Sequence, residues 1–227
     1  IYDPKEREKS TGHKRPPLLQ KGKETFEFIK KHLENYQKIT CGNNYDTIGD
    51  FRFDNLIKTM FTGFPSTDWV PPFLRYYDKF EGKNIYEFLA LLDNKFSADW
   101  IAQFSPTARI EAMNSITKEI DSADSYVDVL RSDKLRFDAD KLFSELDGNI
   151  YGRRFARYIL LKLDYLYKNQ DQRMNFETIS IEHILPQNPS NDSQWKKDFS
   201  EDEREMFTDK IGNLVLISRK KNASQGR

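Results

Sequence analysis

Cysteine, long apolar runs and an excess of one charge sign are all lacking in this sequence. Cys41 is the only cysteine among 227 residues, which excludes an internal disulfide and a cysteine-based zinc site. No apolar run approaches the roughly 20 residues that a membrane-spanning helix needs, and no signal peptide is visible. These absences predict a protein of the reducing cytoplasm with no membrane partner.

The charge balance excludes a grossly basic nucleic-acid-binding tail but permits local basic patches. The chain has 36 basic and 36 acidic side chains, so its formal net charge is zero. Residues 201–209 hold five acids and one base, whereas residues 210–227 hold five bases and no acid. Aromatic residues make up 14% of the chain, which is typical of a folded core and not of a disordered segment. The zero total is therefore an average over unlike segments.

Most of the chain has the sequence pattern of helices. Residues 1–20 are polar, with Gly and Pro, and are predicted to be a linker or an arm. Apolar side chains then recur at three- and four-residue steps through much of residues 21–175, which predicts a helical domain. We expect Phe26, Ile29 and the apolar stripe at 89–100 to belong to its core.

Several boundaries within this helical domain can also be predicted. Residues 63–72 contain three prolines and are expected to interrupt the helices. Ser105 followed by Pro106 is typical of an N-cap and a first-turn proline, so a helix should begin there. The longest regular pattern predicts a helix over 151–167.

The sequence pattern changes from helical to strand-like after residue 175. Residues 178–185 alternate and are rich in isoleucine, and residues 211–218 form a second β-branched run, so each predicts a strand. Between these two predicted strands, Ser200 and Glu203 form a capping-box pattern that predicts a short helix. The predicted fold is mainly α, of the α+β class. A helical body is followed at 176–227 by a small strand–loop–strand unit that enters a helix at its end.

The residues with the clearest chemical potential lie in this last unit. Glu182 and His183 are neighbours near the end of the first predicted strand, which Pro186 terminates. Asn213 follows His183 by thirty residues, and Asn222 follows Asn213 by nine. A histidine at a strand end can act as a general base near neutral pH, and carboxylate and amide oxygens suit Mg²⁺. Neighbouring strand residues point to opposite faces unless the strand ends or bends there.

These motifs resemble a known nuclease family. The order of glutamate, histidine and the two asparagines resembles the ββα-metal (His-Me finger, HNH) nuclease motif. The strings IEHILPQ at 181–187 and IGNLVLI at 211–217 are similar to the C-terminal domain of GmrSD-type restriction endonucleases. The string GRRFARYIL at 152–160 is similar to the helical part of that family. The resemblance is strong over about residues 150–225.

The resemblance implies a role for each matching residue. His183 would be the general base that activates water, and Asn213 would orient it through a hydrogen bond. Glu182 and Asn222 would hold one divalent ion, Mg²⁺ or Mn²⁺. The ion would stabilise the charge that develops on the scissile phosphate. The chain ends five residues after Asn222, so the last helix of the unit is expected to be truncated.

The resemblance also implies partners. The substrate would be DNA, cut by an HNH-type endonuclease within a restriction or phage-defence protein. In that family an N-terminal nucleotide-hydrolysing sensor domain typically accompanies this one. No P-loop pattern occurs in the sequence, and the chain begins at Ile1, so it is expected to be part of a longer protein that carries the sensor elsewhere.

Two basic clusters are candidate contacts to the nucleic-acid backbone, because guanidinium groups suit paired phosphate oxygens. One is expected at the start of the helix over 151–167, where cations oppose the helix dipole, and the other precedes Asn222. The candidates are Arg153, Arg154, Arg157, Arg219, Lys220 and Lys221.

Other interpretations of the same residues stay open. Asn213 could simply form a turn, Glu182 could be a solvated strand residue, and the arginines could pair with acids. His13 and His32 are not accompanied by motif residues like those around His183, and they are expected to be structural. At the level of function, the alternatives are a non-catalytic helical interaction or nucleic-acid-binding module with a decayed nuclease motif, and an RNase that uses the same motif.

Overall fold

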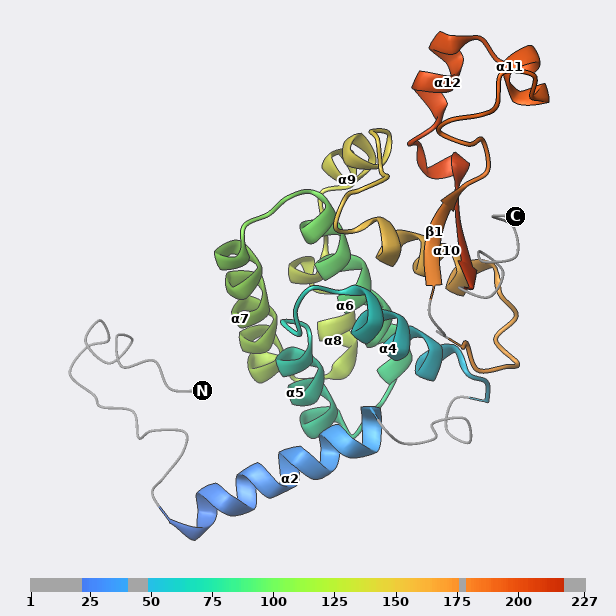
Figure 1. Ribbon diagram of the computed structural model, residues 1–227. Helices are drawn as coiled ribbons and strands as arrows, with labels where there is room; N and C mark the ends of the chain where they lie inside the picture. Colours follow the sequence, from blue (N-terminus) through green and yellow to red (C-terminus); the bar gives the residue numbers. More distant parts are fainter. Residues whose placement is uncertain (1–21, 41–48, 176–178, 219–227) are drawn as a thin grey trace. The chain divides into compact units, whose positions relative to one another are not determined.

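The computed structural model describes residues 22–40, 49–175 and 179–218 (Figure 1). The chain divides into two compact units, residues 1–42 and 43–227. Within the described residues the secondary structure is mainly α-helical with one two-stranded sheet, so the predicted fold class is confirmed. The predicted boundaries of the arm, the helical domain and the nuclease unit stay predictions. No helix in the described part of the chain is long and apolar enough to cross a membrane.

The described part of the first unit is helix α2 (Lys23–Thr40). Ion pairs one turn apart line its surface, such as Lys23 with Glu27 at 3.2 Å. Phe26 and Ile29 are 74% and 51% exposed, so the prediction that they belong to a core is wrong. A helical apolar period shows that a helix has an apolar stripe, but it does not show that another element covers the stripe.

The helical body of the second unit surrounds α6, which is buried along much of its length (Figure 1). Helices α4, α5, α7, α8 and α9 contact it, and α10 packs against α4. The elements of this body are α4 (Arg52–Gly63), α5 (Val70–Phe80), α6 (Ile85–Ile101), α7 (Pro106–Ser122), α8 (Tyr126–Leu130), the short 3₁₀ helix η1 (Asp133–Leu135), α9 (Ala139–Leu146) and α10 (Ala156–Tyr167).

Two of the predicted boundaries in this body differ from the structure. Pro71 and Pro72 were expected to lie in a break, but they form the first turn of α5, where a proline loses no hydrogen bond. The helix predicted over 151–167 begins only at Ala156, because the chain forms turns at residues 151–152 and 154–155. The N-cap at Ser105 is confirmed, since its hydroxyl accepts a hydrogen bond from the Ala108 N–H at 3.2 Å.

The C-terminal part is an antiparallel hairpin of β1 (Ile179–His183) and β2 (Leu214–Ser218). Leu214 and Leu216 pack with Ile181 against a cluster that includes Phe155 and Ile159, so this face of the hairpin rests on the N-terminal half of α10. The connection between the strands contains α11 (Gln194–Asp198), α12 (Glu201–Phe207) and the 3₁₀ helix η2 (Ile211–Asn213). The predicted capping box of Ser200 and Glu203 is present at the start of α12.

The segment that leads into the hairpin is fixed to α4. The buried side chain of Asn55 donates to the Gln170 side chain at 2.8 Å and accepts from the Met174 N–H at 2.7 Å. The Lys58 ammonium donates to the Met174 carbonyl at 3.1 Å. Residues 170–174 are therefore held on the helical body just before β1 begins.

Candidate active site around His183

His183 is the last residue of β1, and its side chain is only 9% exposed. Its Nε2 lies 3.1 Å from Oδ1 of Asp209, which follows α12. The ring of Tyr151 packs against the imidazole, with ring centroids 4.3 Å apart. The histidine predicted to be a general base is thus held between a carboxylate and an aromatic ring.

Asp209 is itself anchored through its backbone. Its carbonyl accepts hydrogen bonds from the N–H groups of Ile150 at 2.7 Å and Tyr151 at 3.2 Å. The Gln187 side-chain amide donates to Asp209 Oδ1 at 3.3 Å, and the ammonium of Lys210 donates to the Asp147 carbonyl. These bonds join the end of the inter-strand connection to the turns that precede α10.

Asn213 makes hydrogen bonds different from the one that the resemblance implied. Its Oδ1 accepts from the Leu185 N–H at 2.7 Å, and its Nδ2 donates to the carbonyls of Leu185 at 3.0 Å and Thr208 at 2.8 Å. Both amide hydrogens are therefore directed at main-chain oxygens, and the hydrogen bond of His183 goes to Asp209. Asn213 fixes the backbone that leaves β1 after His183 and does not hold the imidazole directly.

Glu182 lies on the other face of the hairpin from His183. In the antiparallel register Glu182 pairs with Val215 and His183 with Leu214, so the two neighbours alternate across the sheet. β1 pairs regularly with β2 as far as His183, and the chain bends only after it, at residues 184–185.

The second predicted metal ligand, Asn222, lies outside the described residues, as do Arg219, Lys220 and Lys221. Among the residues that the structure describes, no group of three His, Cys, Asp or Glu side chains converges as a metal site.

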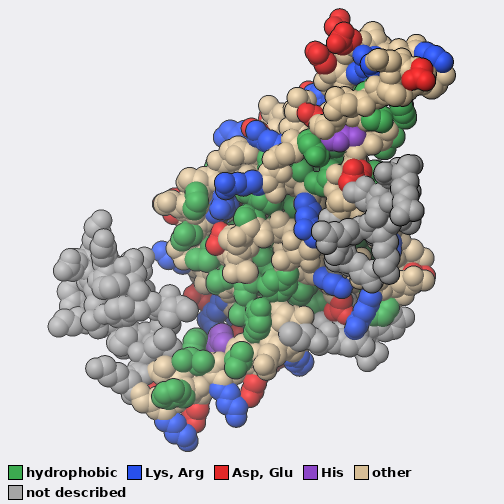
Figure 2. All heavy atoms as spheres, viewed as in Figure 1, with side chains coloured by type: hydrophobic (Ala, Val, Ile, Leu, Met, Phe, Trp, Pro, Cys, Tyr) green, Lys and Arg blue, Asp and Glu red, His purple; other side chains and the backbone are tan. Residues whose placement is uncertain are grey.

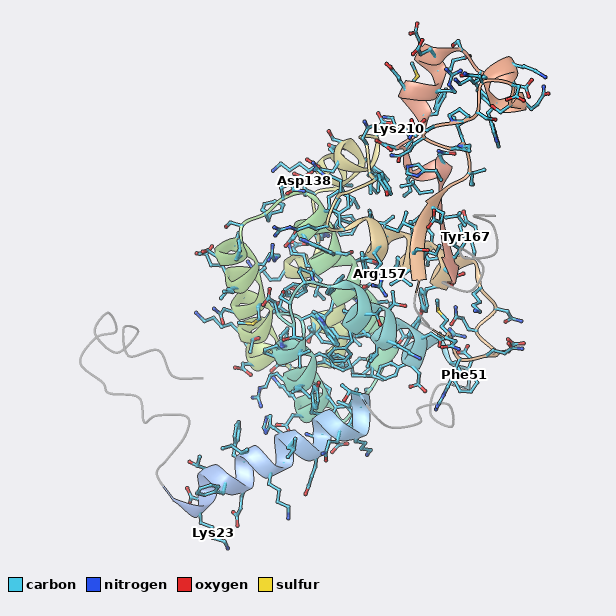
Figure 3. All side chains as sticks on the ribbon, in the orientation of Figure 1. Lys23, Phe51, Asp138, Arg157, Tyr167 and Lys210 are labelled. Atoms are coloured by element: carbon cyan, nitrogen blue, oxygen red, sulfur yellow. The ribbon has the colours of Figure 1, made fainter. Side chains whose placement is uncertain are left out.

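The arginine cluster around the start of α10 contains two kinds of residue. Arg153 forms an ion pair with Glu145 at 2.6 Å, which confirms for this residue the alternative of pairing with an acid. Its side chain is 44% exposed, and such surface pairs are easily replaced by other partners. Arg154 and Arg157 are exposed and have no ion pair within the described residues. Arg157 lies in the first turn of α10, the helix on which β2 packs (Figure 3).

Sequence reasoning did not find Asp209 or Tyr151. Asp209 stands four residues before Asn213 and Tyr151 one residue before the string at 152–160, so both adjoin recognisable motifs. Neither residue type at these positions carries a signal of its own, since Asp and Tyr are common in turns and cores. Their role around His183 becomes visible only when the two turns meet.

The site is therefore a hairpin whose histidine is paired with a carboxylate, next to a helix that begins with arginines. Comparison with known proteins relates this part of the chain to a protein family. Residues 136–226 match the family model described as GmrSD restriction endonucleases, C-terminal domain. The match covers the turns before α10, α10 itself and the whole hairpin, and it confirms the predicted resemblance for this part of the chain. Over these residues the chain is similar to the C-terminal domain of restriction endonucleases of that family. No curated protein and no solved structure matches the chain.

Proposed function

We propose that residues 176–227, supported by the helical body, form an HNH-type endonuclease unit that hydrolyses DNA phosphodiester bonds. The observation that carries this proposal is the family match over 136–226, which includes His183 and its carboxylate partner. A nearly buried histidine that is paired with an acid and placed at a strand end suits proton transfer from water. We also propose that the intact protein acts in restriction or phage defence with a nucleotide-hydrolysing sensor domain.

The proposed mechanism assigns steps to residues of this chain. His183 would accept a proton from the attacking water, and Asn213 would keep the backbone around residue 185 in place through its three main-chain bonds. Arg154 and Arg157 would bind phosphate oxygens beside the hairpin, since both are exposed and are not paired within the described residues. Arg153 would exchange Glu145 for a phosphate at little cost.

Metal dependence is part of the proposal. Mg²⁺ or Mn²⁺ would be held by Glu182 and Asn222, and would stabilise negative charge on the phosphate.

The test is nicking of supercoiled plasmid DNA by the full chain with Mg²⁺ or Mn²⁺. His183→Ala should lower the rate about 10²- to 10⁴-fold, the usual loss for a general base. His32→Ala is the matched control, because it removes the same group from α2 and should leave the rate unchanged. Equal rates for wild type and His183→Ala would refute the nuclease assignment. Cutting of RNA but not DNA under the same conditions would favour the RNase alternative, and a metal chelator should abolish either activity.

A further inference from the structure

The carboxylate beside His183 comes from a part of the chain that the nuclease motif does not include. We propose that Asp209 is a positioning residue that fixes the His183 ring in the Nε2–H tautomer and leaves Nδ1 as the proton-accepting atom. Its meaning for catalysis rests on the proposed nuclease function, whereas the tautomer itself can be tested without any activity.

The tautomer follows from the chemistry of the pair. An ionised carboxylate can only accept hydrogen bonds, so the nitrogen that faces it must carry the proton. Asp209 Oδ1 lies 3.1 Å from Nε2 of His183, and a neutral imidazole has only one N–H. The lone pair is therefore on Nδ1.

The other ring nitrogen is free to act on a water molecule. Within the described part of the chain Nδ1 of His183 has no hydrogen bond, and it is not among the fully buried polar atoms that lack a partner there. Because the side chain as a whole is 9% exposed, the accessible part of the ring includes this nitrogen. This is the arrangement that a general base needs, with one nitrogen held by the protein and the other open to solvent.

The position of Asp209 does not depend on His183. Its carbonyl is held by the N–H groups of Ile150 and Tyr151, and the Gln187 amide supports its carboxylate. Tyr151 also packs against the imidazole, so the turn that anchors the Asp209 backbone supplies the second contact to the ring. The ring is thus restrained by two residues whose backbones are bonded to each other.

The pairing has a consequence for the rate. When His183 accepts a proton it becomes a cation, and the carboxylate at Nε2 stabilises that cation and keeps Nδ1 directed at the water. Asp209 contacts neither water nor phosphate in this scheme. If Asp209 acts as the carboxylates that orient metal-bound histidines do, its loss should cost about 10- to 100-fold in activity. The loss should fall on kcat, because DNA binding does not involve Asp209.

The first experiment detects the tautomer by ¹⁵N NMR of the full chain without metal. A His13→Gln/His32→Gln background leaves His183 as the single histidine, and the spectra are recorded at alkaline pH. We expect a single Nε2–H pattern with a ring N–H signal protected from solvent, which Asp209→Ala should remove. Asp198→Ala, a control acid that accepts a hydrogen bond from Gln194 on α11, should leave the signal intact. An Nδ1–H pattern in the wild type, or a signal unchanged by Asp209→Ala, would overturn the proposal.

The second experiment measures nicking by Asp209→Asn, an isosteric change that keeps the backbone carbonyl and so the fold. We expect kcat to fall about 10- to 100-fold with KM for DNA unchanged, and partial recovery in Asp209→Glu. Recovery of the Asp209→Asn rate at high Mg²⁺ would instead make Asp209 a metal ligand and refute the positioning role. If the wild type shows the predicted tautomer but cuts no DNA, the nuclease function fails and the pairing stands.

Discussion

Replacing Asn213 by alanine should weaken the link between the strand that carries His183 and the connection that follows α12. The amide of Asn213 is the only part of the side chain that alanine removes, and it makes three hydrogen bonds to backbone groups. They reach the N–H and carbonyl of Leu185, which is 5% exposed, and the carbonyl of Thr208. The substitution therefore leaves one donor and two acceptors without their partners in a part-buried site.

The expected cost can be worked out from these three bonds. A net hydrogen bond contributes about 1 kcal/mol, and a buried group left unpaired costs about 1–3 kcal/mol. Leu185 is nearly inaccessible, so its N–H should bear the larger penalty, while water can reach the carbonyl of Thr208 more easily. We expect a loss of about 2–4 kcal/mol in the free energy of unfolding.

Urea denaturation of the full chain measures the global loss, and hydrogen exchange of the Leu185 amide measures the local one. Asn94→Ala is the matched control, since Asn94 is an exposed asparagine on α6 whose side chain has no hydrogen bond within the described residues. It should change stability by less than about 0.5 kcal/mol. A loss below about 1 kcal/mol in Asn213→Ala, or unchanged protection of the Leu185 amide, would refute the role given to this side chain.

Three further predictions concern the helical body. Burial raises the pKa of Asp93, against the lowering effect of Lys162, so the folded state keeps a proton that the unfolded state releases. Stability should therefore fall as pH rises from about 3.8 through the raised pKa, and Asp93→Asn should flatten that part of the urea-denaturation curve against pH. An unchanged slope would contradict this. Lys79→Met should cost about 1–3 kcal/mol, because the ammonium donates to three carbonyls at the end of α7; a loss near zero would show that water replaces it. Asn55→Ala should cost about 3 kcal/mol and increase proteolysis within residues 170–174, whereas unchanged cleavage would show that other contacts hold this segment.

Local signals in the sequence predicted much of the secondary structure correctly. The N-cap at Ser105, the capping box at Ser200 and the two strands depend on residues within a few positions of one another, so nearby sequence is enough to define them. The predicted helix start at 151 and the predicted break at Pro71 were wrong. Each depends on how a turn packs against other elements, and nearby sequence does not determine that packing. Pro71 suits a first helical turn as well as a break, and only the packing of α5 decides between them.

The five acids of residues 201–209 lie in two different places in the structure. Four acids, at residues 201, 202, 203 and 205, lie on α12, within the connection between the two strands (Figure 2). Asp209, the fifth acid of that segment, is separated from them and faces His183. A count of charges along the chain could not distinguish the carboxylate that faces His183 from the four exposed ones on α12.

The sequence by itself determined the helical character of the body, the two strands and the nuclease motif around His183, because periodicity, capping and short motifs are local properties. Only the tertiary structure decided which groups meet. It paired His183 with Asp209 across 26 positions, directed Asn213 to the backbone, and placed Glu182 on the opposite face of the hairpin. These choices depend on strand register and on the meeting of two turns, since a side chain's partner is set by distance in space and not by distance along the chain.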